Sequence, residues 1–257
     1  FVMKKVISLF FTAAIVLFIT SCSASCSLNR HDDGPQTNRI VKAQSFDSVS
    51  ADIVGDIYFT QSDTVGVRIE GPQKDVERIN VEFKGGTLVF STEKKFSSFF
   101  NVINSNDVKI YISSPNLVAV NVKGVTDFHA KKIDTDNMLI NLYGVGEAYI
   151  DNIVCDHFST TVKGTGDVNV KSLEALTAKM YLQGTGDINV SCHKVQDTFL
   201  SLQGTGDIDA NMDNCGKVTA NLKGTGDINI KGNVYSLEKS EHGTGDIDTD
   251  KLIVKIK

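Results

Sequence analysis

The sequence predicts an all-β fold, a parallel β-helix or β-solenoid built from coils of about 20 residues. A five-residue phrase, Gly-Thr-Gly-Asp followed by Ile or Val, returns at a fixed spacing through the second half of the chain. A fixed period of tens of residues is typical of solenoids, in which each repeat forms one coil. Apolar and polar residues alternate on both sides of the phrase, which indicates strands rather than helices.

The clear copies begin at Gly164, Gly184, Gly204, Gly224 and Gly243, and weaker copies begin at Gly124 and Gly144. Successive copies lie 20 residues apart, except for the last step of 19. We expect the glycines to occupy a tight corner, where a positive φ or a close backbone contact excludes a Cβ. The acidic residue should fold its carboxylate back onto nearby backbone N–H groups and so stabilise the corner. The predicted corner residues are Gly164, Asp167, Gly184, Asp187, Gly204, Asp207, Gly224, Asp227, Gly243 and Asp246.

Apolar residues recur at equivalent positions before and after each corner. Stacked about 4.8 Å apart, such residues would form ladders that enclose a dry core. We expect right-handed coiling because parallel crossover connections strongly prefer that hand.

The predicted solenoid domain covers residues 39–257. Within it we expect irregular coils over 39–122, regular repeats over 123–250 and a terminal strand over 251–257. Gly85-Gly86 predicts a hairpin or tight turn, and residues 91–106 form an insertion that is either a lid over the core or a contact loop. In the last coil, Lys239 and Glu241 replace ladder residues and should end the core, with the strand from Leu252 covering that end.

The N-terminal segment resembles an export signal. Met3-Lys4-Lys5 precedes an apolar run from Val6 to Thr20, too short for a membrane-spanning helix of about 20 residues. The run ends in Ile19-Thr20-Ser21-Cys22, which resembles the bacterial lipobox. Residues 1–21 are therefore predicted as a lipoprotein signal peptide, and Cys22 as the lipidated residue that anchors the chain to a membrane. Ordinary secretion with cleavage elsewhere is the alternative.

Residues 22–38 have almost no apolar content after Cys22 and predict a flexible tether. The whole chain carries a net charge of −5, and none of its four arginines lies in the repeats. This mild acidity argues against nucleic acid as a partner. Beyond Cys22 and Cys26, the chain has Cys155, Cys192 and Cys215. These three lack metal-ligand spacing and are expected to be buried thiols, although a Cys192–Cys215 disulfide is an alternative.

Several segments together resemble a known family. They are Phe46-Asp47-Ser48-Val49, Gly55-Asp56-Ile57, Gly85-Gly86-Thr87-Leu88-Val89 and Ser114-Pro115-Asn116-Leu117-Val118-Ala119-Val120, followed by the glycine-containing coils. This order resembles the "putative auto-transporter adhesin, head GIN domain" family over about residues 40–250. The resemblance implies a solenoid-like β fold and an envelope location, as in lipoproteins of Bacteroides and its relatives. It supplies no catalytic residues.

Two kinds of site chemistry can be weighed from the residues. Asp127, Glu147, Asp167, Asp187, Asp207, Asp227 and Asp246 would form an acidic column. Ca²⁺ between coils would relieve their repulsion, but backbone capping is the simpler account, and we predict no metal and no cofactor. An enzyme would need clustered catalytic groups, whereas the histidines are scattered and no Ser-His-Asp set or Trp is present. Tyr143, Tyr149 and Tyr181 are candidates for stacking on sugar rings.

We therefore predict a non-catalytic binding or adhesion role at the bacterial cell envelope. The expected location is the outer membrane, as a lipoprotein facing either the surface or the periplasm. The expected ligand is a glycan or a surface protein, met by repeated Asn, Thr, Lys and Gln side chains. A carbohydrate-active lyase or hydrolase is one alternative, and a structural spacer without a ligand is another.

Overall fold

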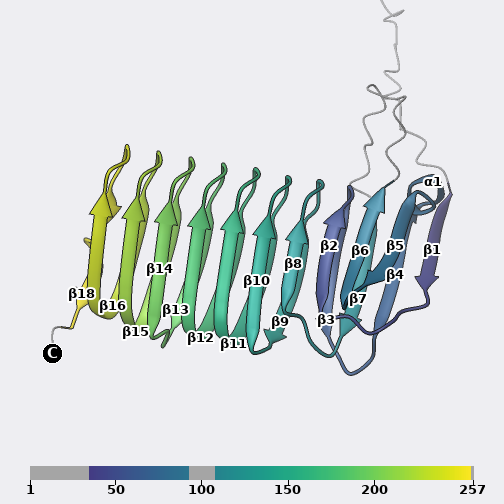
Figure 1. Ribbon diagram of the computed structural model, residues 1–257, viewed down its shortest axis with the longest axis horizontal. Coiled ribbons are helices and arrows are strands. Elements are labelled where there is room, and N and C mark those ends of the chain that lie inside the picture. The colour runs from purple at the N-terminus through teal and green to yellow at the C-terminus, as the bar shows by residue number, and fades with distance from the viewer. Residues whose placement is uncertain (1–34, 93–107, 256–257) are drawn as a thin grey trace, which may run out of the picture. The chain divides into compact units, whose positions relative to one another are not determined.

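The computed structural model describes residues 35–92 and 108–255 (Figure 1). These residues form one sheet of eighteen strands and one short helix. The all-β solenoid with coils of about 20 residues is thus confirmed. Among the described residues, no helix is long and apolar enough to cross a membrane.

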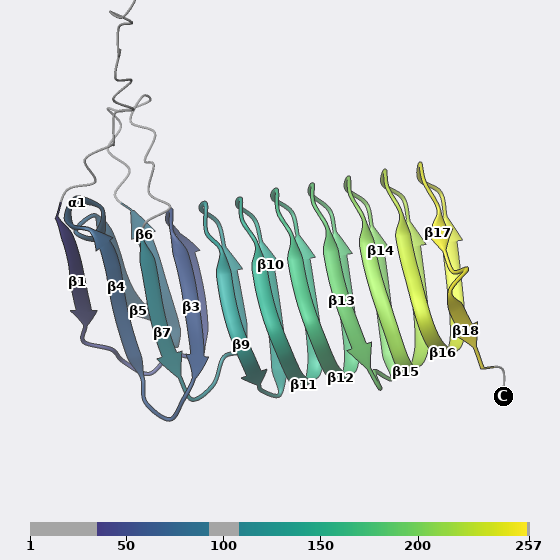
Figure 2. The same ribbon diagram turned by 180° about the vertical axis from the view of Figure 1, so that it is seen from behind.

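The regular coils stack in parallel from β8 onward (Figures 1 and 2). Their strands are β8 (Ala119–Val122), β9 (Phe128–Asp134), β10 (Asn137–Leu142), β11 (Ala148–Val162), β12 (Val168–Leu182), β13 (Ile188–His193), β14 (Asp197–Leu202), β15 (Ile208–Leu222), β16 (Ile228–Glu241), β17 (Ile247–Asp248) and β18 (Leu252–Val254). Each coil has two sides. Side A contains β9, β13 and the first halves of the long strands, whereas side B contains β8, β10, β14 and the second halves. The sequence period sets the register, since Ala148 pairs with Val168 and Val162 with Leu182.

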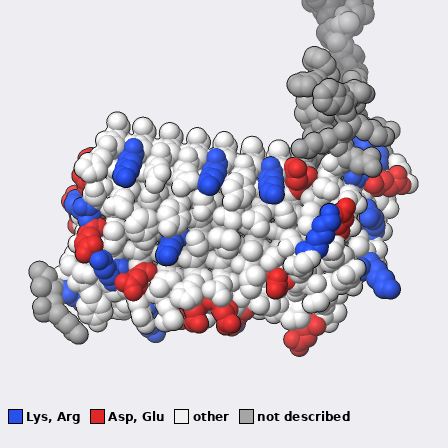
Figure 3. All heavy atoms as spheres, viewed as in Figure 1, with Lys and Arg blue, Asp and Glu red and all other residues white. Residues whose placement is uncertain are grey.

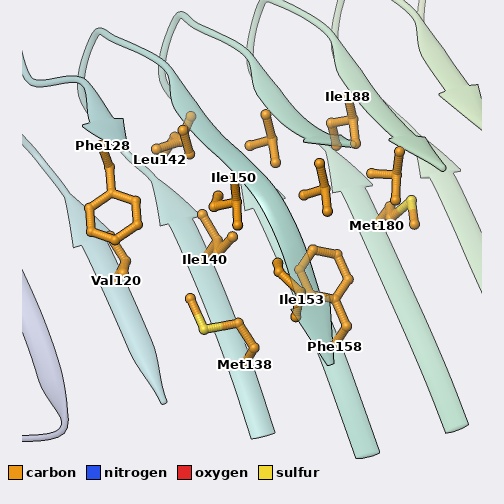
Figure 4. Close-up of a cluster of buried hydrophobic side chains, with 14 of the residues drawn as sticks. Val120, Phe128, Met138, Ile140, Leu142, Ile150, Ile153, Phe158, Met180 and Ile188 are labelled. Atoms are coloured by element: carbon orange, nitrogen blue, oxygen red, sulfur yellow. The ribbon is translucent and has the colours of Figure 1, made fainter. Parts of the chain in front are cut away.

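One core runs between the two sides, because inward side chains alternate with outward ones along every strand. Figure 4 shows part of it, with Phe128 and Ile150 from side A facing Val120, Ile140 and other residues from side B. These side chains are buried, as the apolar columns of the sequence predict. Because the apolar residues of each strand point into this core, the residues between them point outward at equivalent positions in every coil.

The first part of the domain does not follow the order of the chain. β2 (Ser48–Asp52) and β3 (Asp56–Gln61) stack directly on β8 and β9. β6 (Thr87–Thr92) and β7 (Lys109–Ser114) come later in the sequence, yet they pair with the opposite edges of β2 and β3. A coil from residues 48–61 therefore lies between a later coil and the regular repeats.

Antiparallel strands complete this end of the stack. β4 (Gly66–Pro72) pairs with β7, β1 (Gln36–Val41) pairs with β4, and β5 (Ile79–Lys84) pairs with β6. The helix α1 (Gln73–Val76) connects β4 to β5. The predicted hairpin at Gly85-Gly86 is confirmed, since Lys84 and Thr87 are paired across it. The predicted insertion over 91–106 lies almost wholly outside the described residues.

At the other end, β18 pairs in parallel with Gly232–Val234 of β16. The strand from Leu252 thus lies at the end of the stack, and Leu252 packs half-buried against the core, in line with the prediction. It does so as the next member of side A, because its backbone groups pair as those of the earlier coils do. Lys239 and Glu241 replace the ladder residues Ala220 and Leu222 as predicted, and they form an ion pair of 3.2 Å with each other.

Candidate functional site

The repeated phrase builds one edge of the solenoid, where side B turns into side A. The second residue of each copy forms a parallel bridge to its counterpart in the next coil, from Val125 to Thr244. The glycines are required by close backbone contact. A Cβ on Gly164 would lie 1.9 Å from the carbonyl oxygen of Gly144, and one on Gly204 would lie 2.0 Å from that of Gly184. The edge is therefore packed backbone against backbone.

The aspartates of the phrase lie in a column, as predicted, but they do not cap their own corners. Asp167 Oδ1 accepts the backbone N–H of Asp187 in the next coil, at 2.7 Å. The same bond recurs from Asp207 to Asp187 and from Asp227 to Asp207, at 2.8 and 2.7 Å, with further copies at Asp127 and Asp246. Each carboxylate thus accepts a backbone N–H as expected, but the expectation that this capping is local was wrong, because the stacked N–H of the next coil is the group that faces the carboxylate.

The column therefore joins the coils by side-chain hydrogen bonds. Within the part of the chain that the structure describes, no group of three or more His, Cys, Asp and Glu side chains is arranged to hold a metal ion. Glu147 donates its N–H to Asp127, but its own longer side chain makes no such bond within residues 35–92 and 108–255.

A shallow hollow of about 650 Å³ follows this edge over four coils; we call it the edge groove. Each coil supplies a long polar residue, a glycine and a threonine. The lining residues are Gln183, Gly184, Thr185, Gln203, Gly204, Thr205, Lys223, Gly224, Thr225, His242, Gly243 and Thr244. The polar residues and threonines are exposed, and the glycines between them leave a floor without side chains.

An aromatic stack crosses side A, and sequence reasoning found only one member of it, Tyr149. The ring centroids of Tyr111 and Tyr58 lie 5.3 Å apart, those of Tyr58 and His129 4.9 Å, and those of His129 and Tyr149 6.4 Å. The signal was hidden because Tyr58 and Tyr111 come from coils stacked out of chain order.

Cations close both ends of this stack. The Arg68 guanidinium lies 4.4 Å from the centroid of Tyr111, and the Lys171 ammonium lies 4.7 Å from that of Tyr149. The rings of Tyr111, Tyr58 and His129 are stacked face to face, whereas the Tyr149 ring is tilted by 51° from His129 and has the Lys171 ammonium over it. The stack stabilises side A through aromatic and cation–π contacts.

Beside the stack, a hollow of about 260 Å³ lies on side A; we call it the side-A hollow. Its floor includes Val170 and Val190, and its rim is formed by Tyr149, Asn169, Lys171, Asn189, Ser191, Asp209, Asn211 and Lys231. The Asn189 side-chain amide donates a hydrogen bond of 3.1 Å to Asn169 Oδ1, which occupies the equivalent position in the preceding coil. The hollow offers amide, hydroxyl, carboxylate and ammonium groups in fixed register.

Side B carries the other two predicted tyrosines. The Lys163 ammonium lies 5.8 Å from the ring centroid of Tyr143. The ring centroids of Tyr181 and Phe199 lie 5.6 Å apart. Figure 3 shows this side as mostly uncharged, with well-separated lysines in one row near the corner edge. The repeated outward position there holds Lys123, Lys163 and Lys223.

The described cysteines, Cys155, Cys192 and Cys215, are free and buried, as predicted. Burial raises the pKa of the Cys155 thiol to about 12, with a further increase from Asp156. Burial also raises the pKa of Cys192 and of Cys215. These thiols stay protonated at neutral pH and are poor nucleophiles. Cys22 lies outside the described residues.

The histidines lie on separate parts of the surface. His157 Nδ1 lies 2.9 Å from Thr177 Oγ1 on side B, and His193 Nδ1 lies 3.3 Å from Asp213 Oδ2 on side A. His129 belongs to the aromatic stack. The described residues thus bring no Ser-His-Asp set together, and the outward groups that they do bring together are polar ladders in shallow hollows.

A family model described as "Putative auto-transporter adhesin, head GIN domain" matches residues 45–234. The chain belongs to this family. A search of curated proteins gave no match.

Solved structures show the same fold. One is the crystal structure of a "putative adhesin" from Bacteroides fragilis, whose sequence is 32% identical to this chain. The TM-score is 0.76, and the match covers 85% of this chain and 97% of that one. A "putative lipid binding protein" from Parabacteroides distasonis is 20% identical, with a TM-score of 0.63 over 84% of this chain and 98% of that one. The second similarity is one of fold. The family and its adhesin neighbours indicate a non-catalytic binding protein of the cell envelope or surface.

Proposed function

We propose that this protein is a lipid-anchored envelope protein that binds a glycan or a surface protein without catalysing a reaction. The observation that carries the proposal is the outward surface of the solenoid, where polar side chains stand in registered ladders over shallow hollows. The side-A hollow places Asn169, Asn189, Asp209 and Lys231 on adjacent coils. A rigid array of this kind suits a ligand whose own polar groups repeat.

The anchor part of the proposal rests on the sequence. The basic start, the apolar run and the Ile19-Thr20-Ser21-Cys22 end fit a lipoprotein signal with Cys22 as the acylated residue. Acyl chains on Cys22 and the polar stretch that follows it would hold the solenoid near a membrane while leaving its sides free.

A carbohydrate-active enzyme is the second function to test, because Asp56 and Asp127 interact. Burial raises the pKa of the Asp56 carboxyl and the Asp127 charge raises it further, while His129 opposes the shift. Perturbed carboxyl groups of this kind occur at catalytic sites, but structural networks produce them as well. Asp56 lies at the start of β3 beside the aromatic stack, and its carboxylate accepts a hydrogen bond from Tyr58 at 3.4 Å, which is a structural role. We therefore favour binding.

The location can be tested with antibody or protease added to intact cells, beside a Cys22→Ala variant. The proposal expects the solenoid to be membrane-associated in the natural protein and released from the membrane in the variant. Accessibility on intact cells would support a surface ligand, and protection until the outer membrane is broken would place binding in the periplasm. A Cys22→Ala protein that stays in the membrane fraction would contradict the anchor.

A further inference from the structure

The edge groove contains hydroxyl groups that the fold does not require. Its threonines form the parallel bridges that connect one corner to the next. Val125 and Val145 occupy the same position in the first two regular corners and make the same bridges. The backbone therefore accepts valine here, and the threonine hydroxyl adds only an exposed polar group. Four such hydroxyls, on Thr185, Thr205, Thr225 and Thr244, follow one another along the groove.

The long polar side chains of the groove are also available to a ligand. Among the described residues, no ion pair or side-chain hydrogen bond involves Gln183, Lys223 or His242, and all three are exposed. Gln203 donates to Ser201 Oγ at 3.2 Å and keeps its amide oxygen. The groove thus presents ammonium, amide and imidazole groups at successive coils.

The charge of the groove is opposite to that of the chain. The net charge of the protein is −5, yet no carboxylate lines the groove. The nearby residues Asp187 and Asp207 are not part of the lining, and Oδ1 of each accepts a backbone N–H group of the following coil. Lys223 is therefore a cation without an ion-pair partner among the described residues, and the imidazole of His242 adds a hydrogen-bonding group beside it.

The lining also excludes several classes of ligand. It consists of Gln, Gly, Thr, Lys and His, so an acyl chain or an apolar peptide side chain would find nothing to bury against. It contains no arginine and a single lysine, which is too little for a nucleic acid backbone. A polyhydroxylated chain with occasional negative charges fits the groups present.

We infer that the edge groove binds a linear acidic polysaccharide that lies along the solenoid axis. This rests on the proposed binding function and adds the site and the class of ligand. A sugar carboxylate would face Lys223, and sugar hydroxyls would pair with the His242 imidazole, with the amides of Gln183 and Gln203 and with the threonine hydroxyls. Four coils at about 4.8 Å per step span roughly 14 Å, so several sugar units contribute.

The test is binding of the full chain to partly methyl-esterified polygalacturonate, in which only some sugars carry a charge, with fully methyl-esterified polygalacturonate as the uncharged probe. Lys223→Gln places in this column the residue already present at Gln183 and Gln203, so the fold should persist. We expect the dissociation constant to rise about threefold, the typical effect of one exposed charge pair. Thr205→Val copies Val125 and Val145 and should raise the dissociation constant about threefold through one lost hydrogen bond. Lys179→Gln, an equal charge change at an exposed position on side B, is the control and should change nothing.

The outcomes separate the site from the general function. Saturable binding that weakens with salt, with full methyl esterification and with both groove variants supports the inference. Binding that survives both groove variants but weakens in Lys231→Gln would overturn it and move the ligand to the side-A hollow, leaving the proposed function intact. Absence of binding to partly methyl-esterified polygalacturonate would overturn the inference, while the envelope location would still be decided by the cell experiment.

Discussion

Glycine is required in the corners for two reasons that meet at Gly206. Its φ is +127°, a region that residues with a Cβ rarely adopt. A Cβ there would also lie 2.0 Å from the carbonyl oxygen of Gly186. Because this clash is with a backbone atom, it can be relieved only if the two coils move apart.

Gly206→Ala should therefore lower the free energy of unfolding by about 3 kcal/mol or more, since backbone strain and a steric clash add. Urea unfolding followed by circular dichroism measures this. Gly85→Ala is the matched control, because Gly85 has a φ of +56° and no atom within 4 Å of the added Cβ. It should cost only about 1–2 kcal/mol. Equal losses in the two variants would contradict the role of close packing.

The carboxylate column makes a second prediction at this scale. Asp207→Ala leaves the half-buried N–H of Asp227 without its acceptor. We expect a loss of about 1–3 kcal/mol in the free energy of unfolding, the cost of an unsatisfied buried donor.

Asp207→Asn keeps an acceptor oxygen and removes a charge from the column, so it should unfold close to the natural protein. Glu147→Asp should stabilise by about 0.5–1.5 kcal/mol by completing the series of inter-coil bonds. If Asn and Ala at position 207 were equally destabilising, charge rather than hydrogen bonding would hold the coils together.

Asp56 predicts a dependence of stability on pH. Burial first, and then Asp127, raise the pKa of its carboxyl above 3.8 in the folded protein. The folded state therefore binds this proton more tightly than the unfolded chain does. Stability from this group is present below the unfolded pKa and is lost as the pH rises through the folded pKa.

Asp56→Asn removes that titration and should be more stable than the natural protein at neutral pH, with the difference vanishing toward pH 3–4. Thermal unfolding of both proteins across this range measures it. A constant difference at all pH values would show that the effect does not come from ionisation.

At the scale of the element, one coil is the unit of the structure. Each regular coil contacts mainly the coils before and after it, and equivalent residues pair across 20 positions. In such a solenoid, stability is approximately a sum of repeat terms and nearest-neighbour interfaces.

Deleting the 20 residues 184–203 should therefore give a shorter but folded solenoid, because Gln183 then leads into Gly204 with the register intact. Deleting only residues 184–193 removes side A of one coil and should unfold the repeats that follow. Circular dichroism and limited proteolysis distinguish the two variants. A folded half-coil deletion, or an unfolded full-coil deletion, would contradict the coil as the unit.

The sequence predicted the elements best where they repeat. The period placed β11, β12 and β15 because a fixed spacing specifies both the pairing partner and the register. It did not predict that residues 48–61 stack between the later strands β6–β7 and β8–β9. Those segments share no sequence repeat, and the alternation of apolar and polar residues identifies a strand without identifying the strand that it pairs with. The aromatic stack of Tyr58, Tyr111 and His129 was missed for the same reason.

At the scale of the whole molecule, the described residues combine a dry core with outward ladders that border open hollows. The column of aspartates was predictable from its spacing, but the partner of each carboxylate was not, because the N–H it meets belongs to another coil. The edge groove combines residues that each look solvated in the sequence. It becomes visible as a surface only once the coils are stacked.

The most direct test of the proposed function is to follow a bound glycan on the purified full chain. The protein would be titrated against a panel of glycans, and each bound glycan would then be recovered and sized by chromatography. Non-catalytic binding predicts saturable binding with the glycan recovered at its original length. Shortened or unsaturated products that disappear in an Asp56→Asn or Asp127→Asn variant would contradict it and establish an enzyme.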